Sequence, residues 1–226
     1  MEILDHIFTE EAKSKRKRAY EKLVQMSRFP IKKTLDDFDF SSQPSIDKRQ
    51  IDELATMRFL ENGKNVVFLG PPGVGKTHLA SALDLVTAQY RFSTYYINCH
   101  QLIEQLKKSH FENRLPDKLK VLAKYRMLII DEIGYLPMGI QGANLFFQLI
   151  ARRYEKTSTV FISNKTSSQW NEVFADVTIA SAILDRVLHH CTVINIKGES
   201  YCLKERKDFM RQKQQIVNTL FDLGNV

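Results

Sequence analysis

A short glycine-rich segment carries a lysine and a threonine at a spacing that could hold phosphate. Residues 70–77 read Gly-Pro-Pro-Gly-Val-Gly-Lys-Thr, which fits the pattern GxxxxGK[ST]. Glycines let the main chain curl until several N–H groups point at one anion, and a following helix adds the positive end of its dipole. Lys76 could then reach the β- and γ-phosphates, and Thr77 could hold Mg²⁺. The predicted nucleoside triphosphate contacts are Gly70, Pro71, Pro72, Gly73, Val74, Gly75, Lys76, Thr77 and His78.

The residues on either side supply the context that this pattern needs. An apolar run, Asn65–Leu69, precedes the segment, and a helical stretch near 76–90 follows it. In a chain of this length the bare pattern arises by chance in about one sequence per hundred, and the strand–loop–helix context lowers that further. The alternative is a glycine turn that only caps a helix.

Two adjacent carboxylates follow a second apolar run. Met127–Ile130 reads as a buried strand, and Asp131 and Glu132 come directly after it, about 50 residues beyond the phosphate loop. Open α/β sheets place ligands at the carboxyl ends of their strands. We therefore expect Asp131 to hold Mg²⁺ and Glu132 to polarise the water that attacks the γ-phosphate. The alternative is a strand followed by a solvated turn.

A polar side chain also ends a third apolar run, Thr159–Ser163. The amide of Asn164 would lie beside the γ-phosphate, where it could orient the attacking water. The alternative is an asparagine that only begins a loop. The neighbouring motifs favour the first interpretation.

These residues need a sheet to bring them together. Short apolar strands alternate with helices, which predicts an α/β fold: a three-layer sandwich with a five-stranded parallel sheet. The predicted strands are Asn65–Leu69, Thr94–Asn98, Met127–Ile130, Thr159–Ser163 and Thr192–Ile196. The predicted helices lie near 46–61, 76–90, 99–110, 141–155, 178–190 and 199–222. Trp170 is expected to anchor a segment that leads from a loop into a helix.

Positive charge is concentrated near the N-terminus. The formal net charge is +7, and residues 9–33 hold nine lysines and arginines against three glutamates, or +6 of that total. The segment reads as a basic helix with a weak apolar stripe, ended by Phe29-Pro30. A one-signed basic helix favours binding to the DNA backbone without base readout. A solvated face and an acidic protein partner are the alternatives.

Composition bears on whether the chain is a membrane, secreted or metal-binding protein. The 226 residues suffice for one α/β domain with a small appendage, and no apolar run approaches the roughly 20 residues that span a bilayer. The first residues lack the features of a secretory signal, and three widely spaced cysteines indicate a reduced, cytoplasmic chain. Adjacent His189 and His190 cannot easily face one ion, so helix-end packing is expected there rather than metal binding.

Taken together, the motifs resemble the IstB branch of AAA+ ATPases, P-loop NTPases that help insertion-sequence transposition. The resemblance covers residues from about 3 to 207, and the DnaC- and DnaI-type helicase loaders are the nearest relatives of that branch. It is carried by RFPIKKTLDDFDF (28–40), GPPGVGKTHLA (70–80), LIIDEIGY (128–135), FISN (161–164), ILDRVLHH (183–190) and GESY (198–201).

The resemblance implies a role for each matching residue. Lys76 and Thr77 would form Walker A, Asp131 and Glu132 Walker B, and Asn164 sensor 1. The cofactors would be ATP and Mg²⁺.

Three further positions are less directly implied. Arg186 resembles the arginine finger that completes a neighbour's ATP site, which requires an oligomer, although an arginine on an amphipathic helix is usually only solvated. Phe38 and Phe40 either lie near the adenine, as the resemblance suggests, or pack the linker onto the sheet. Cys202 stands where relatives often carry arginine, so no nucleotide contact is expected from it.

The resemblance also implies an organisation and partners. We expect a short basic N-terminal helical region, a linker with a helix, an AAA+ core and a C-terminal helix with little or no lid. The expected partners are double-stranded DNA, a cognate transposase and further copies of the chain, with no membrane. The corresponding boundaries are 1–33, 34–62, 63–198 and 199–226.

The leading hypothesis is an oligomeric ATPase that binds duplex DNA and assists a transposase in target selection and integration. A replicative helicase loader of the DnaC type would have an almost identical core. A small-molecule kinase would require a mobile arginine-bearing lid, for which the chain has no long insertion. A nucleotide-gated switch with negligible turnover is the fourth possibility.

Overall fold

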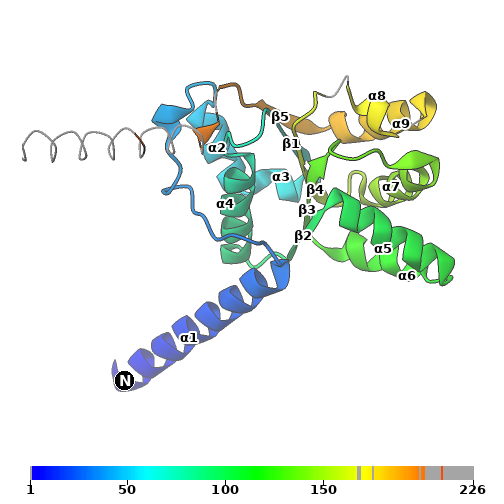
Figure 1. The fold of residues 1–226 in the computed structure, drawn as a ribbon. Coiled ribbons are helices and arrows are strands. Elements are labelled where there is room, and N and C mark those ends of the chain that lie inside the picture. Colours follow the sequence, from blue (N-terminus) through cyan, green and yellow to red (C-terminus); the bar gives the residue numbers. More distant parts are fainter. Residues whose placement is uncertain (1, 167–168, 175, 199, 202–209, 211–226) are drawn as a thin grey trace, which may run out of the picture.

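The computed structural model describes residues 2–166, 169–174, 176–198, 200, 201 and 210. Five parallel strands form one sheet in the order β2-β3-β4-β1-β5. Helices cover both faces of the sheet, so the predicted α/β sandwich is confirmed (Figure 1). The strands are β1 (Asn65–Leu69), β2 (Thr94–Asn98), β3 (Met127–Ile133), β4 (Ser158–Ser163) and β5 (Cys191–Asn195).

The ends of three strands differ from the prediction, and β4 differs only in beginning one residue earlier, at Ser158. β3 continues through Asp131 and Glu132 because its pairing with β4 resumes after a bulge between Ile130 and Ile133. β5 begins and ends one residue earlier than predicted, where it pairs in parallel with β1. Hydropathy located the strands correctly, but their ends are decided by the register with neighbouring strands.

Alternate residues of each strand pack into two apolar cores. Val67 and Phe161 face α5 to α9, whereas Val66 and Ile162 face α2 to α4. Burial on both faces explains why the strands read as continuous apolar runs. The first face carries α5 (Cys99–Phe111), α6 (Leu115–Lys124), α7 (Gly139–Arg153), α8 (Trp170–Phe174) and α9 (Val177–Leu188), and the second α2 (Lys48–Ala55), α3 (Arg58–Glu61) and α4 (Lys76–Gln89).

Several helical segments refine the predicted ones. The single helix predicted over 46–61 is wrong: Met57 adopts a left-handed conformation, φ 62°, which separates α2 from α3. The short helices α6 and α8 were not predicted. Trp170 in α8 is buried and donates from Nε1 to the Ser163 hydroxyl at 3.3 Å, which confirms its anchoring role.

The N-terminal helix α1 (Glu2–Ser27) lies within the predicted helical region 1–33 and projects away from the sheet (Figure 1). Near its C-terminal end, Val24 packs against Leu85 and Ala88 of α4. The ring of Phe29 then lies 4.4 Å from that of Tyr96 on the edge strand β2. Phe29-Pro30 therefore follows the helix end, as predicted, and fastens the chain to the edge of the sheet.

The predicted helix 199–222 and Cys202 fall largely outside the described residues, and so does the question of a lid. Within the part of the chain that the structure describes, no helix combines the length and the apolar character needed to cross a membrane.

Candidate nucleotide-binding site

The glycine-rich segment forms a tight loop between β1 and α4. Gly70 adopts φ 150° and lies so close to the neighbouring chain that an added Cβ would sit 2.3 Å from the Ile196 carbonyl oxygen. Gly75 adopts φ 97° and caps α4, and a Cβ there would sit 2.6 Å from Cε2 of Phe38. These two positions need glycine for both conformation and space. The predicted loop is thus formed with its main chain curled ahead of the helix.

The Lys76 ammonium lies inside this loop. The residue is buried, and Nζ donates to the carbonyl oxygens of Gly70 and Pro71, each at 2.7 Å. Burial lowers the pKa of Lys76, while the charge of Asp131 opposes that change. A buried ammonium held by two carbonyls is ready to exchange these weak partners for phosphate oxygens.

Asp131 is the buried carboxylate of the site. The Thr77 hydroxyl donates to its Oδ2 at 3.2 Å, and the Tyr96 hydroxyl donates to the same oxygen at 3.1 Å. Burial raises the pKa of Asp131, and the charge of Glu132 adds to the increase, whereas the hydrogen bonds oppose it. Tyr96 was not predicted, because nothing in its local sequence marks it as a partner of a residue 35 positions away.

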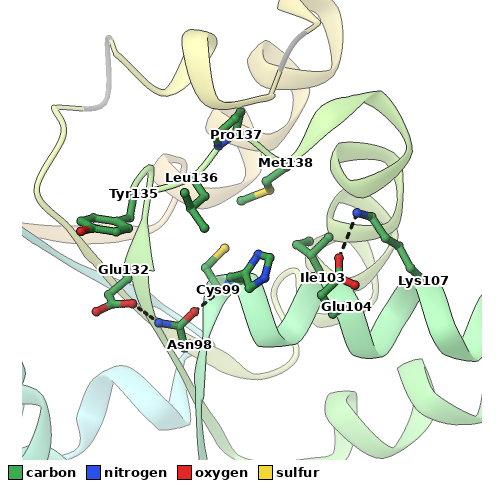
Figure 2. Close-up of a pocket in the computed structure, with 11 residues that line it drawn as sticks. Asn98, Cys99, Ile103, Glu104, Lys107, Glu132, Tyr135, Leu136, Pro137 and Met138 are labelled. Carbon is green, nitrogen blue, oxygen red and sulfur yellow. Dashed lines mark hydrogen bonds and ion pairs between the residues drawn. The ribbon is translucent and has the colours of Figure 1, made fainter.

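Glu132 is aimed by the bulge in β3. Its φ of 60° is a left-handed conformation that is uncommon for a residue with a side chain, and bulges often redirect side chains beside active sites. Its carboxylate is exposed, and Oε2 accepts a hydrogen bond from the Asn98 amide (Figure 2). Asn98 ends β2 opposite Asp131. The rule that identified Asn164, a polar residue at a strand's carboxyl end, could also have identified Asn98.

A cavity of about 220 Å³, here called the phosphate-side cavity, gathers the predicted residues. β1, β3 and β4 lie side by side, so their carboxyl ends meet there. Tyr135 also lines it, and this residue was not predicted to take part. The lining residues are Pro72, Gly73, Lys76, Thr77, Asp131, Glu132, Tyr135, Ile162, Ser163 and Asn164.

A second cavity, of about 250 Å³, lies on the other side of the loop and is here called the linker-side cavity. Phe38 forms part of its wall, and the Phe38 ring also packs against those of Phe40 and His78. The His78 Nε2 lies 2.9 Å from the Thr34 carbonyl oxygen, which joins the linker to α4. Phe38 therefore packs within the linker, as one predicted alternative has it, and also lines a cavity beside the phosphate loop; its place near the adenine stays a prediction.

A tyrosine from beyond β5 also reaches this cavity. Tyr201 lines it, and its main-chain N–H donates to the Gly73 carbonyl oxygen at 2.9 Å. An open-sided pocket beside the phosphate loop, with an aromatic wall, suits a purine ring. Val74 is also among the residues that line this cavity, although its side chain is buried in the core behind the loop.

Arg186 lies far from both cavities of its own chain. Its guanidinium lies 4.6 Å from the centroid of the Phe147 ring and donates to the Ala182 carbonyl at 3.1 Å. The Asn65 amide donates to the carbonyl oxygens of Arg186 and Val187. Asn65 begins β1, whereas the phosphate loop follows its other end. Arg186 is therefore at the opposite end of the sheet from Lys76.

The structure brings a carboxylate to the two adjacent histidines. Glu155 Oε1 lies 3.4 Å from His190 Nε2 and 3.8 Å from His189 Nδ1, and all three side chains are exposed. The sequence argument against a metal relied on the absence of further ligands close by in the sequence. Glu155 is distant in the sequence but lies beside the two histidines in the fold. His189 Nδ1 also lies 2.7 Å from the Tyr154 hydroxyl, which competes for the same ring nitrogen.

Comparison with known proteins identifies one family. The family described as IstB-like ATP binding protein matches residues 1–209. A predicted ATP-binding protein of insertion sequence IS232 from Bacillus thuringiensis subsp. berliner is 54% identical over 183 residues, which cover 81% of this chain and 73% of the relative. A predicted ATP-binding protein of insertion sequence IS21 from Pseudomonas aeruginosa is 47% identical, over 91% of this chain and 78% of the relative.

Solved structures show the same fold at lower identity. The crystal structure of the DnaC helicase loader superposes with a TM-score of 0.57 at 24% identity, over 66% of this chain and 87% of the loader. AMPPCP-bound DnaA from Aquifex aeolicus superposes with a TM-score of 0.61 at 18% identity, over 82% of this chain and 56% of DnaA. With the phosphate loop formed and the family matched over most of this chain, the chain belongs to the IstB-like ATP-binding proteins.

Proposed function

We propose that this protein is a Mg²⁺-dependent ATPase that binds duplex DNA in its ATP state, assembles on it and assists a transposase in target selection and integration. The observation that carries the proposal is the phosphate-side cavity, where Lys76, Thr77, Asp131 and Glu132 face one space. An ammonium, a hydroxyl and two carboxylates in that arrangement match the requirements of phosphoryl transfer to water.

The residues present fit a magnesium ion. The Thr77 hydroxyl and the Asp131 carboxylate are hard oxygen donors 3.2 Å apart, beside the curled loop. Bound there, Mg²⁺ would neutralise charge on the phosphate oxygens. Asp131 would hold the ion, while Thr77 would supply a second oxygen to it.

The other residues would act on phosphate and water. Lys76 would stabilise the charge that develops on the transferred phosphoryl group. Glu132, more exposed than Asp131, would accept hydrogen bonding from the attacking water, and the Asn98 amide would hold its carboxylate in place. Asn164, which lines the same cavity, would orient that water.

Two observations support assembly on DNA. The exposed basic residues of α1 lie on a helix that projects from the ATPase core (Figure 1), as expected for contacts with phosphate backbone. Arg186 lies too far to reach its own phosphate-side cavity, so a role at a γ-phosphate requires a neighbouring subunit.

The transposase as partner is favoured by the relatives. Proteins 42–54% identical to this chain carry names that place them in insertion sequences. The helicase-loader alternative has only fold similarity in its favour. A pull-down that captures the replicative helicase of the host and leaves the neighbouring transposase unbound would reverse this preference.

DNA binding with different nucleotides tests the proposal. We expect the chain to shift random duplex DNA with ATP or a non-hydrolysable analogue, and to form a large assembly only when nucleotide and DNA are both present. Lys76→Ala should lose both effects, because the ammonium that contacts the phosphates is gone. DNA binding that is indifferent to ATP and to salt would defeat the proposal.

A further inference from the structure

A hollow beside the end of α1 has the composition of an anion-binding site. Its walls come from α1, β2, α5 and α6, and its volume is about 470 Å³. Arg28 and Lys118 line it, together with the rings of Tyr95 and Tyr125. Among the described residues that line the hollow there is no Asp or Glu. A hollow with two cations and no carboxylate has a positive potential that attracts anions.

The two cations are close enough to repel each other. Burial lowers the pKa of Lys118, and the charge of Arg28 lowers it further. Within the residues that the structure covers, neither side chain is ion-paired with a carboxylate, and Lys118 Nζ instead donates to Gln105 Oε1 at 2.7 Å. Holding like charges together costs free energy, which a bound anion would offset.

Aromatic packing orients Arg28 toward this hollow. Its guanidinium lies 5.8 Å from the centroid of the Tyr95 ring, which stacks on Tyr125 at 5.0 Å with an interplanar angle of 26°. Arg28 also has φ 58°, at a position after the helix where glycine or asparagine is favoured. An arginine in that conformation, supported by a ring, is pre-organised to bind an anion.

The hollow continues a basic face of α1. Arg18 and Lys22 are exposed on α1, and Gln25, three residues after Lys22, lines the hollow. Spacings of four and three residues place these side chains on one face of a helix. An extended polyanion that lies along this face would arrive at Arg28 and Lys118.

We propose that Arg28 and Lys118 together bind one backbone phosphate of duplex DNA at the point where the DNA leaves helix α1. This inference rests on the proposed DNA-binding function and assigns it a path: along α1 and past the edge of β2, on the face that carries α5 and α6. The contact is with phosphate, so it contributes affinity at any base sequence.

Salt dependence of binding provides the test, using the full chain with a non-hydrolysable ATP analogue and random duplex DNA. Because the two cations share one phosphate, the double variant Arg28→Gln/Lys118→Gln should reduce the slope of log K against log salt by about 0.9 and weaken binding about eightfold near 0.1 M salt. Each single change should give a part of that loss. Lys120→Gln is the matched control: Lys120 is exposed on α6, two residues away on another face, and should change neither quantity as much. Lys118→Arg, which keeps the positive charge, should bind DNA as the unmodified chain does.

A second variant separates charge from folding. Gln105→Glu would place a carboxylate beside Lys118, so the folded state should be retained while DNA affinity falls to the level of Lys118→Gln. Basal ATP hydrolysis should stay unchanged, because neither cation lines the nucleotide cavities.

Equal DNA binding by Lys118→Gln, Gln105→Glu and the Lys120→Gln control would overturn the inference. So would a loss confined to single-stranded DNA, since the proposal assigns the phosphate to a duplex. If the unmodified chain fails to bind any DNA, the proposed function itself fails, which is a different result.

Discussion

At the scale of single residues, neighbouring carboxylates in one strand have different environments. Asp131 is buried and accepts from the Thr77 and Tyr96 hydroxyls, whereas Glu132 is exposed and accepts from the Asn98 amide. The bulge in β3 produces this difference, since it turns Glu132 away from the path of the strand. One carboxylate is thereby suited to hold an ion and the other to act on water.

Substitution of Glu132 should separate ATP binding from hydrolysis. Glu132→Gln should retain ATP affinity within about threefold while kcat falls about 10²- to 10⁴-fold, the range for loss of a general base. Phosphate release and equilibrium nucleotide binding measure the two quantities. Hydrolysis at nearly the original rate would show that another group activates the water. Asn98→Ala, which frees the Glu132 carboxylate, should lower kcat by less than Glu132→Gln does.

Gly75 provides a test of loop geometry. Gly75→Ala should abolish ATP binding, because its Cβ would collide with Phe38 at 2.6 Å and its φ is 97°. Gly139→Ala is the matched control, since Gly139 has φ 66° with nothing within 4 Å of an added Cβ, and it should cost only the conformational strain of about 1 kcal/mol. Nucleotide affinity and urea unfolding distinguish the two, and equal effects would contradict the collision argument.

At the scale of elements, α1 is fastened to the core through a buried carboxyl group. The Ser27 hydroxyl at the end of α1 donates to Asp84 Oδ2 of α4 at 2.7 Å. Burial raises the pKa of Asp84 from 3.8 to about 6, and the hydrogen bond from Ser27 opposes that increase. Docking of the basic helix therefore depends on an acid that the fold prefers in its protonated form.

This arrangement predicts a pH-dependent stability. Because the folded-state pKa of Asp84 lies above its unfolded value, its favourable contribution is complete below about pH 3.8 and is lost as pH rises through about 6. The pKa of Asp84 rises from 3.8 to about 6 on folding, and each pKa unit corresponds to about 1.4 kcal/mol, so the free energy at stake is about 3 kcal/mol. Asp84→Asn should therefore stabilise the protein by up to about 3 kcal/mol at pH 8 and have little effect near pH 4.

Thermal unfolding of Asp84→Asn across this pH range is the measurement. Asp52→Asn, which neutralises an exposed carboxylate on α2, serves as its control and should show no such trend. Destabilisation by Asp84→Asn at pH 8 would contradict this prediction, because it would mean that the ionised carboxylate stabilises the fold.

At the scale of the whole molecule, Arg186 and the phosphate loop lie at opposite ends of the sheet. The separation along β1 alone is about 13 Å, at about 3.3 Å for each residue. A subunit arranged head to tail with its neighbour could bring the two ends together, as heterologous interfaces do. A completed site would then contain residues of two chains.

Mixing two inactive variants tests this arrangement. Arg186→Ala has an intact phosphate loop and Lys76→Ala an intact Arg186, so an equal mixture should recover about a quarter of the activity through mixed interfaces. A mixture of Lys76→Ala with Glu132→Gln is the control. Both residues line the same cavity of one chain, so every subunit in this mixture carries a defective cavity and the mixture should stay inactive. Equal activity in the two mixtures would exclude a role in trans for Arg186.

The sequence by itself determined the local parts of this protein. The phosphate loop, the five strands and the basic N-terminal helix each depend on residues adjacent in the chain, through glycine spacing, apolar runs and charge. Those signals are local, so they survive without knowledge of the fold. The family resemblance drew on the same local motifs.

Only the tertiary structure decided which distant residues meet. The parallel order of the strands sets Asn98 beside Glu132 and Tyr96 beside Asp131, and chain folding sets Lys118 beside Arg28. Such contacts depend on strand order, register and helix packing, and no short stretch of sequence records them. The bulge at Glu132 has the same origin, because it is a property of two paired strands and not of one.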